Sequence, residues 1–344
     1  MPQSSLNAES LGTTSPDCLN VNPIEARIDV SSMCQLNCVR CPVAQRQGRP
    51  FIGRGVLPLA DFIQFVDGNP QIKVIEIGNS GEVFLNPDLP GILRYAYEKD
   101  VIIRLAEGAN LNDASEEALE ALVKYRVSFV RVSIDGATQE SYRKYRVGGN
   151  LKNVLGNVQR INGYKKKYRS SFPRLILQFI PFGHNEHEIR KMPVMARALG
   201  MEMYFKLNLF RGYNPLRDRA DLAALLGYSD LDSYLEKTGE IYMRDICLQL
   251  WRAPQLNWDG RLLGCSANSS VAYAEYALGS AFTKEINNDH IRYARKMLMG
   301  MAPERPDIPC VTCDLYADYK KLNRWFTPSE IKEGMQRRPP QMDF

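Results

Sequence analysis

The sequence has little that would point to a membrane or to nucleic acid. Its 344 residues contain no apolar run of about 18, the length that spans a bilayer, so we expect no membrane-spanning helix. The net charge of +5 is small for this length and does not favour a nucleic-acid-binding protein. The N-terminus is polar and lacks the basic start and apolar stretch of a signal peptide. We therefore expect a cytoplasmic protein.

Histidine and cysteine are also scarce, with three and eight residues respectively. Three of the cysteines, Cys34, Cys38 and Cys41, nevertheless crowd into eight residues with no histidine nearby. In a reducing compartment such a cluster indicates a metal rather than a disulfide. Structural zinc takes four protein ligands, whereas three thiolates on a four-iron cluster leave one iron open. From the residues alone, a zinc or structural site stays open as the alternative.

Strand-like and helix-like segments alternate from about residue 26 to residue 208. Six strand-helix units predict a parallel sheet but are too few for an eight-unit barrel. We therefore expect an α/β fold, an open partial (β/α)6 TIM-like barrel with its site at the C-terminal strand ends. Asn185 followed by Glu188 predicts a capping box, and Gly200 predicts a helix end. The strand candidates are 26–32, 72–79, 101–107, 127–134, 174–181 and 201–208.

A different kind of segment follows the last strand candidate. It contains two short predicted helices, 217–226 and 229–238, and then a predicted hairpin that turns at Asp259-Gly260. A further helix is expected around 284–301. The predicted division of the chain is a flexible N-terminal tail (1–24), the barrel (25–210), a helical linker (211–244), a small cysteine-containing domain (245–325) and a C-terminal tail (326–344).

The spacing C-x3-C-x2-C on the loop after the first strand resembles the radical S-adenosylmethionine (SAM) superfamily. That resemblance implies a [4Fe–4S] cluster held by Cys34, Cys38 and Cys41, with SAM bound to the open iron through its amino and carboxylate groups. It also implies that SAM is split reductively to methionine and a 5′-deoxyadenosyl radical, which takes a hydrogen atom from the substrate. An electron donor such as flavodoxin or ferredoxin is the implied partner.

Other segments resemble the SAM-binding segments of the same superfamily. In "GNSGEVFLNPDL", the resemblance implies that Gly81 lets the backbone approach the cofactor and that Glu82 accepts a hydrogen bond from the SAM ammonium. In "VSIDGAT", it implies that Ser133 and Asp135 face the SAM ribose or carboxylate. Arg146, in "YRKYRVGGN", resembles the arginine that holds the SAM carboxylate.

Three positions bear on adenine and substrate recognition. Arg40 stands beside the third cysteine, where many relatives have an aromatic residue, so part of the adenine recognition must come from elsewhere. Glu107 lies in "AEG", where relatives often have T-N-G. Its carboxylate could accept from substrate hydroxyls or amines or take a proton, which makes it the catalytic candidate. The alternative is an ion pair with a neighbouring Arg or Lys. Lys206 is either structural or an anion contact.

Four of the remaining cysteines form a second set. Cys247 and Cys265 resemble the first half of the SPASM pattern, in which a glycine turns a hairpin, and Cys310 and Cys313 supply a C-x2-C pair. No cysteine follows Cys313, so the resemblance is to the short form, the twitch domain, and implies one auxiliary [4Fe–4S] cluster. A zinc ribbon with four cysteine ligands is the alternative. Cys18 stays unassigned.

The function that the resemblance favours is that of a twitch-type radical SAM enzyme. Its expected substrate is a small polar molecule, a sugar, aminocyclitol or nucleoside, changed by oxidation, epimerisation, decarboxylation or rearrangement, as in antibiotic biosynthesis. The alternative is a maturase of a ribosomal peptide, which is less expected because only 33 residues precede Cys34. A non-catalytic iron–sulfur carrier or zinc scaffold is the third possibility, and the segments that resemble SAM-binding ones argue against it.

Overall fold

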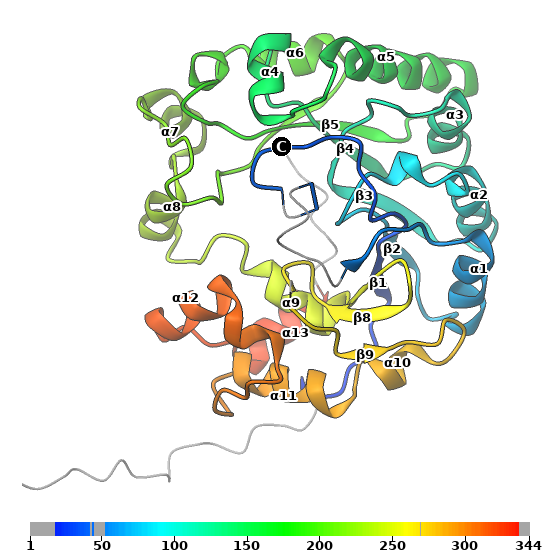
Figure 1. Cartoon of the computed structure of the whole chain (residues 1–344), viewed down its shortest axis with the longest axis vertical. Coiled ribbons are helices and arrows are strands. Elements are labelled where there is room, and N and C mark those ends of the chain that lie inside the picture. The colour runs from blue at the N-terminus through cyan, green and yellow to red at the C-terminus, as the bar shows by residue number, and fades with distance from the viewer. Residues whose placement is uncertain (1–17, 42, 45–51, 269, 337–344) are drawn as a thin grey trace, which may run out of the picture.

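The computed structural model describes residues 18–41, 43–44, 52–268 and 270–336. Six parallel strands form one curved sheet, and helices cover its outer face (Figure 1). The predicted α/β arrangement with a parallel six-stranded sheet is therefore confirmed. The strands are β1 (Glu25–Ile28), β2 (Val74–Glu76), β3 (Ile102–Ala109), β4 (Phe129–Ser133), β5 (Arg174–Phe179) and β6 (Glu202–Phe205). The helices among them are α1 (Leu59–Gly68), η3 (Val83–Leu85), α2 (Leu89–Glu98), α3 (Glu116–Lys124), α4 (Gln139–Tyr145), α5 (Leu151–Tyr168), η4 (Glu186–Glu188) and α6 (Met192–Ala198).

The C-terminal part of the chain extends the same sheet rather than forming its own. The strand order is β6-β5-β4-β3-β2-β1-β7-β8-β9, with β7 parallel to β1 and the last two pairs antiparallel. The predicted hairpin joins β7 to β8, and Gly260 has the positive φ of +84° that its turn requires. These strands are β7 (Gln255–Leu256), β8 (Arg261–Gly264) and β9 (Ala274–Glu275).

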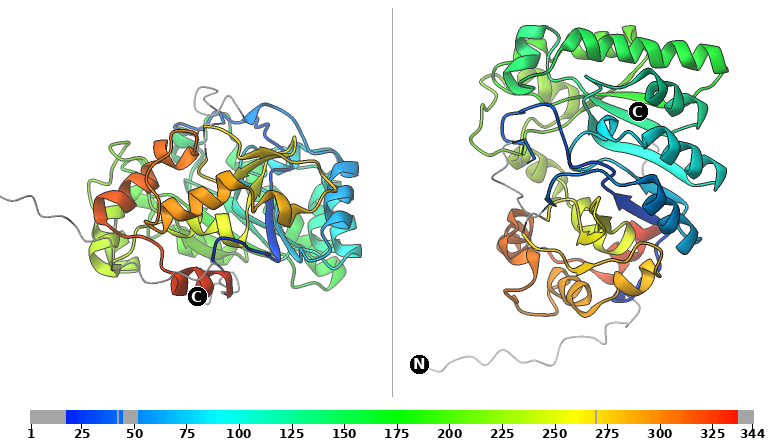
Figure 2. Two further views of the ribbon diagram at one scale, coloured as in Figure 1. Left: turned by 90° about the horizontal axis from the view of Figure 1, so that it is seen from below. Right: turned by 45° about the vertical axis from the view of Figure 1, so that its right-hand side comes forward.

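Helices α9 (Asp245–Arg252) to α13 (Pro328–Gln336) lie together near β8 and β9 (Figure 1 and Figure 2), whereas α7 and α8 lie apart from them, on the side of α4 (Figure 1). Helix α13 packs against α9, which leads into β7. None of the described helices is long and apolar enough to cross a membrane. The helices after β6 are α7 (Ala220–Leu226), α8 (Leu231–Thr238), α9 (Asp245–Arg252), α10 (Phe282–Glu285), α11 (Asp289–Leu298), η5 (Pro309–Thr312), α12 (Asp314–Leu322) and α13 (Pro328–Gln336).

The two faces of the barrel strands differ in polarity. In β4, Val130 and Val132 are fully buried in the apolar core, and Arg131 and Ser133 alternate with them. Because side chains alternate across a strand, the core residues face the helices and the polar ones face the barrel interior. The first strand follows the same rule, with Ala26 and Ile28 in the core. The barrel interior is therefore lined by ionisable side chains.

Residues 18–24 and 328–336, which the sequence assigns to the two tails, form contacts or a helix in the structure. Residues 1–17 and 337–344 lie outside the described residues. Residues 18–24, which were expected to belong to a flexible tail, pack against the C-terminal part of the chain. Trp251 Nε1 donates to the Cys18 carbonyl at 2.7 Å, and Arg295 Nη1 donates to the Leu19 carbonyl at 2.7 Å. Within the expected C-terminal tail, α13 forms.

The predicted capping box at Asn185 is wrong. The Asn185 side chain is fully buried and accepts from the Phe182 amide at 2.6 Å, so it closes the loop after β5 instead of starting a long helix. The Glu188 carboxylate accepts from the Ala137 amide at 2.9 Å in the neighbouring loop. Gly200 does follow the end of α6 with a φ of +65°, as predicted.

The segment after the cysteine loop is anchored on the C-terminal hairpin. Trp258 Nε1 and Asn257 Nδ2 each donate to the Ile52 carbonyl at 2.9 Å. Gly55 packs against the Trp258 indole, and an added Cβ would come within 2.3 Å of the ring. The hairpin therefore holds the chain that leaves the predicted cluster-binding loop.

Candidate active site

The three clustered cysteines lie in the loop that follows β1. A turn brings them together, with the Cys41 amide donating to the Cys38 carbonyl at 3.1 Å and Arg40 in the left-handed region at a φ of +68°. Burial raises the pKa of Cys34 to about 12, and the charges of Cys38 and Cys41 add to that effect. The three thiols therefore lie within electrostatic range of one another, as the motif predicts.

Two donors from the barrel strands and their loops reach the sulfur atoms of this loop. Asn110 Nδ2 lies 3.7 Å from Cys34 Sγ, and Arg146 Nη1 lies 3.7 Å from Cys38 Sγ. Hydrogen-bond donors and a positive charge stabilise thiolates, which are the form that ligates iron. The contact from Arg146 was not foreseen, because nothing in the sequence links it to a cysteine more than 100 residues away.

Two of the predicted SAM contacts near the end of β4, Asp135 and Arg146, form an ion pair with each other. Asp135 is completely buried, and its carboxylate accepts from Arg146 Nε at 2.6 Å and from the Ile180 amide at 2.7 Å. Ser133 Oγ accepts from Gln178 Nε2 at 3.2 Å. The structure thus brings Ser133, Asp135 and Arg146 to one end of the barrel, beside the cysteine loop. Their contacts with SAM stay predictions.

Gly81 and Glu82 lie against the start of the cysteine loop. Gly81 has a φ of +80°, and an added Cβ would come within 2.6 Å of the Ser31 carbonyl oxygen, so the close approach it permits here is to this loop. Glu82 accepts from the Asn110 amide at 2.7 Å through Oε2, and its own amide donates to the Met33 carbonyl at 2.6 Å. Burial raises the pKa of Glu82 to about 7, although the two amides that it accepts from oppose the shift.

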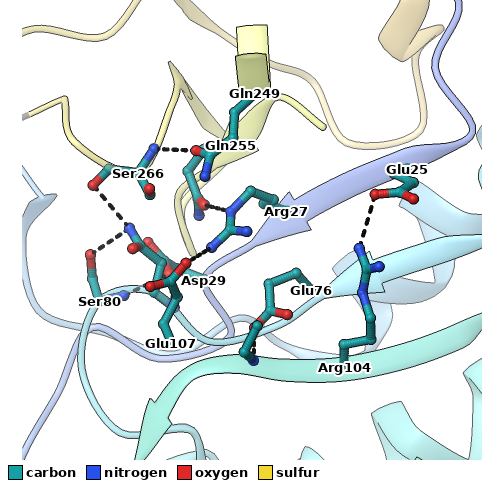
Figure 3. Close-up of polar contacts among 12 residues, drawn as sticks. Glu25, Arg27, Asp29, Glu76, Ser80, Arg104, Glu107, Gln249, Gln255 and Ser266 are labelled. Carbon is teal, nitrogen blue, oxygen red and sulfur yellow. Dashed lines mark hydrogen bonds and ion pairs between the residues drawn. The ribbon is translucent and has the colours of Figure 1, made fainter. Parts of the chain in front are cut away.

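Glu107 lies inside β3 and faces two cations across the barrel interior. Its carboxylate is 2.7 Å from Arg27 Nη2 and 4.0 Å from Lys206 Nζ (Figure 3 shows the contact with Arg27). Burial alone would raise the pKa of Glu107, but Arg27, Lys206 and Arg131 together hold it below its ordinary value. The ion-paired alternative is confirmed, and the group is an anion at neutral pH. Its role in catalysis stays a prediction.

A polar network continues from this ion pair to the C-terminal part (Figure 3). Arg27 Nε donates to Gln255 in β7 at 3.1 Å, and Arg104 donates to Glu25 at 2.9 Å. Sequence analysis missed these residues. The signal was present in "EARID", where charged residues occupy every second position of a strand and therefore one face of it.

The second set of cysteines comes together in the C-terminal part. Cys247 and Cys310 are buried, and Cys265 and Cys313 are half-buried. Burial raises the pKa of Cys247, and the charges of the other three cysteines add to that effect. Because these positions come from α9, the end of β8, η5 and the start of α12, the fold gathers four thiols from separate elements at one place. Tyr273 adds a contact, with its hydroxyl 3.6 Å from Cys310 Sγ.

Both sets fit iron–sulfur clusters by the chemistry of their donors. No disulfide joins any of the eight cysteines. Among the described residues, no group of three or more Cys, His, Asp or Glu side chains is placed to hold one metal ion. Four thiolates are also the ligand set of structural zinc, which stays the alternative for the second set. A [4Fe–4S] cluster puts its own iron and sulfide atoms between the thiolates and so takes thiols that are further apart.

Comparison with known proteins agrees with this site. The model of the Radical SAM superfamily matches residues 28–192. An AdoMet-dependent heme synthase of Methanosarcina barkeri (strain Fusaro / DSM 804) is 29% identical over 178 residues, which are 51% of this chain and 48% of the relative. The chain thus aligns with about half the length of that curated relative.

A solved structure shares the fold over most of the chain. Streptococcus suis SuiB has a TM-score of 0.60 and 14% sequence identity, and the match covers 85% of this chain and 71% of SuiB. SuiB bound to S-adenosylmethionine gives the same TM-score with 13% identity, covering 86% of this chain and 69% of that one. At this identity the likeness concerns the fold alone. Residues 28–192, which carry the cysteine loop after β1 and most of the barrel, are therefore a radical SAM domain.

Proposed function

We propose that this chain cleaves SAM reductively and abstracts a hydrogen atom from a small polar substrate. The observation that carries the proposal is the cysteine loop after β1, whose Cys34 and Cys38 sulfurs receive donors from Asn110 and Arg146. When bound, the cluster would supply an electron to SAM and so yield methionine and a 5′-deoxyadenosyl radical. The protein groups around it hold the thiolates, orient SAM and keep water from the reacting atoms.

Asp135 and Arg146 act together in this proposal. The buried Asp135 carboxylate fixes the guanidinium of Arg146 through its Nε atom, which leaves the Nη atoms directed toward the Cys38 sulfur and the cofactor side. Both Glu82 carboxylate oxygens accept backbone amides, and each has a second lone pair free for the SAM ammonium. These assignments make Glu82, Ser133, Asp135 and Arg146 the proposed SAM contacts.

We also propose an auxiliary [4Fe–4S] cluster on Cys247, Cys265, Cys310 and Cys313, which would make the C-terminal part a twitch-type domain. Four cysteine ligands leave no iron open to the substrate, so this cluster would transfer electrons or shape the interior. Flavodoxin or ferredoxin stays the predicted electron donor, and a cytoplasmic location stays a prediction.

The preference for a small polar substrate is supported by the barrel interior, where Arg27, Arg131 and Lys206 interact electrostatically with Glu107. The alternative is a peptide substrate, which the fold likeness to SuiB favours, since SuiB has also been solved bound to its precursor peptide SuiA. Incubation with sugars, nucleosides and synthetic leader peptides, followed by mass spectrometry, separates the two. Product formed only from a leader peptide would refute the first assignment.

The SAM-cleaving activity is tested with anaerobically reconstituted, reduced full-length protein. We expect 5′-deoxyadenosine from SAM in the wild type and none above background in Cys38→Ala, because the cluster would lose one of its three ligands. Cys18→Ala is the matched control and should retain the activity, since the contact of Cys18 with Trp251 uses its backbone carbonyl. Equal 5′-deoxyadenosine from the wild type and Cys38→Ala would overturn the proposal.

The auxiliary cluster has a separate test in the iron content. Cys310→Ala should lower the iron by about four atoms per chain while the cysteine loop after β1 keeps its own cluster. Unchanged iron in this variant, or stoichiometric zinc in the wild type, would exclude the auxiliary cluster without affecting the SAM-cleaving proposal.

A further inference from the structure

Two of the three cations around Glu107 in the barrel interior form no ion pair shorter than 4.0 Å among the described residues. Glu107 is 23% exposed and forms its short ion pair with Arg27. Lys206 and Arg131 also lie within electrostatic range of the same carboxylate. Glu107 therefore faces cations from β1, β4 and the residue after β6, and the one from β1, Arg27, also interacts with Glu76 and Asp29.

Two of these cations have no hydrogen-bond acceptor among the described residues. The Lys206 ammonium is only 14% exposed, and its contact with Glu107 is long at 4.0 Å. Arg131 forms no ion pair in the described part of the chain, and its buried Nε atom has no acceptor. Its guanidinium instead stacks on the Tyr204 ring at 4.1 Å. Burying a cation without a partner costs free energy, so the arrangement favours an anion in the space between them.

The geometry of the two groups suits an oxyanion. The guanidinium of Arg131 is held flat by Tyr204, and a planar guanidinium presents N–H groups that match the oxygens of a carboxylate or phosphate. Lys206 adds a compact charge with three donors. Gln178 lies in β5, the strand next to β4, and its buried Oε1 atom also has no partner, so it is free to accept a hydrogen bond from a hydroxyl group of a bound molecule.

Arg131 lies on the strand that leads to the residues beside the cysteine loop. Arg131 and Asp135 are four residues apart along β4 and the loop that continues it, which is roughly 13 Å at 3.3 Å per residue. Asp135 holds Arg146 beside Cys38. An anionic group on Arg131 would therefore place the rest of a molecule of about sugar or nucleoside size toward the cysteine loop.

We propose that Arg131 and Lys206 form a binding site for an anionic group, a carboxylate or a phosphate, and that Glu107 fixes Lys206 toward it. The assignment of this anion to the substrate rests on the proposed function. The existence of the anion site does not depend on it. The site makes the substrate class a phosphorylated or carboxylated small polar molecule.

The anion site is tested by titrating the full-length reconstituted protein with inorganic phosphate and, separately, with acetate by isothermal calorimetry, without SAM or reductant. We expect saturable binding of one of these anions, and at least tenfold weaker binding in Arg131→Gln and in Lys206→Gln. Tighter binding of phosphate than acetate would identify a phosphate ester as the substrate group, and the reverse order would identify a carboxylate. Arg190→Gln and Lys144→Gln, which alter exposed cations on the outer surface, should bind as the wild type does.

Two results would overturn the site. One is that neither anion binds saturably to the wild type, and the other is that both Gln variants bind like the surface controls. Arg131→Lys keeps the positive charge and should retain weak binding where Arg131→Gln has none. This difference would show that the loss in Arg131→Gln comes from the missing charge and not from misfolding. The titration needs no SAM, so a negative titration would refute the anion site without bearing on SAM cleavage. A negative 5′-deoxyadenosine assay would refute the proposed SAM cleavage without bearing on the anion site.

Discussion

At the scale of single residues, one buried tyrosine contacts a cysteine of the second set. Tyr273 is 5% exposed, and its hydroxyl lies 3.6 Å from Cys310 Sγ. A hydroxyl that donates to a thiolate ligand stabilises the extra negative charge of a reduced cluster, and such hydrogen bonds tune cluster potentials.

We therefore expect Tyr273→Phe to lower the reduction potential of the proposed auxiliary cluster while the iron content stays the same. The measurement is a redox titration followed by electron paramagnetic resonance. Tyr276→Phe is the matched control, because its hydroxyl contacts Asn69 and the Ser280 carbonyl and no cysteine. Equal shifts in both variants would mean that the Tyr273 hydroxyl does not act on the cluster.

Glu76 gives the stability of the protein a pH dependence. Burial raises the pKa of Glu76 to about 7, although Arg27 and the Ala106 amide oppose the shift. The folded protein therefore holds this proton between about pH 4.5 and pH 7, where the unfolded chain has released it. The contribution of Glu76 to stability is complete below pH 4.5 and is lost as the pH rises through 7.

We predict that the free energy of unfolding falls less between pH 5 and pH 8 in Glu76→Gln than in the wild type. The difference between the two falls should reach about 3 kcal/mol at pH 8. The amide oxygen of Gln can still accept from the Ala106 amide, which Glu76 does at 2.7 Å. Urea unfolding of the wild type and the variant at pH 5, 6, 7 and 8 measures the difference. Parallel pH profiles for the two proteins would contradict it.

At the scale of elements, the hairpin between β7 and β8 supports the segment that leaves the cysteine loop. Gly55 has no room for a side chain against Trp258, because an added Cβ would come within 2.3 Å of the ring. We expect Gly55→Ala to destabilise the protein by about 1–3 kcal/mol, the usual cost of overpacking. Gly156→Ala in α5 is the control, because a Cβ there meets nothing within 4 Å and should stabilise the helix by about 0.5–1 kcal/mol.

Thermal or urea unfolding measures both glycine variants. A second readout is SAM binding, which should weaken in Gly55→Ala if the hairpin holds the loop in place and should not change in Gly156→Ala. Stability within error of the wild type in Gly55→Ala would show that the indole moves aside without cost.

The elements also show what the sequence could and could not predict. The strands of the barrel were predictable because Val and Ile runs are strong local signals, and the cysteine loop was predictable because its three ligands are close in sequence. The capping box at Asn185 failed because the side chain instead bonds to the Phe182 amide and the Ile180 carbonyl in its own loop and, across the barrel end, to the Asp135 carbonyl. The pairing of Arg146 with Asp135 and Cys38 depends on contacts across the barrel, which local patterns do not encode.

At the scale of the whole molecule, β7 joins the C-terminal part to the barrel. The amides of Arg27 and Asp29 donate to the carbonyls of Pro254 and Leu256 at 3.1 and 3.0 Å. The sheet is therefore continuous across the boundary that the sequence predicted between two domains. The boundary signals in the sequence were changes of composition, which do not show whether two segments share backbone hydrogen bonds.

We predict that the chain unfolds as one cooperative unit. All three tryptophans, Trp251, Trp258 and Trp325, lie in the C-terminal part, so their fluorescence reports on that part, whereas far-ultraviolet circular dichroism reports on the helices of both parts. The two signals should change at the same urea concentration. A fluorescence midpoint clearly below the circular dichroism midpoint would show two separately folding units.

The place of β1 between β2 and β7 also affects how the protein is made. Arg27 and its partner Gln255 are 228 residues apart, so one edge of the first strand has nothing to pair with until most of the chain has left the ribosome. Unpaired strand edges attract other chains. A nascent or prematurely terminated product that stops before residue 254 should therefore depend on chaperones or aggregate, whereas the finished polypeptide covers that edge with its own hairpin.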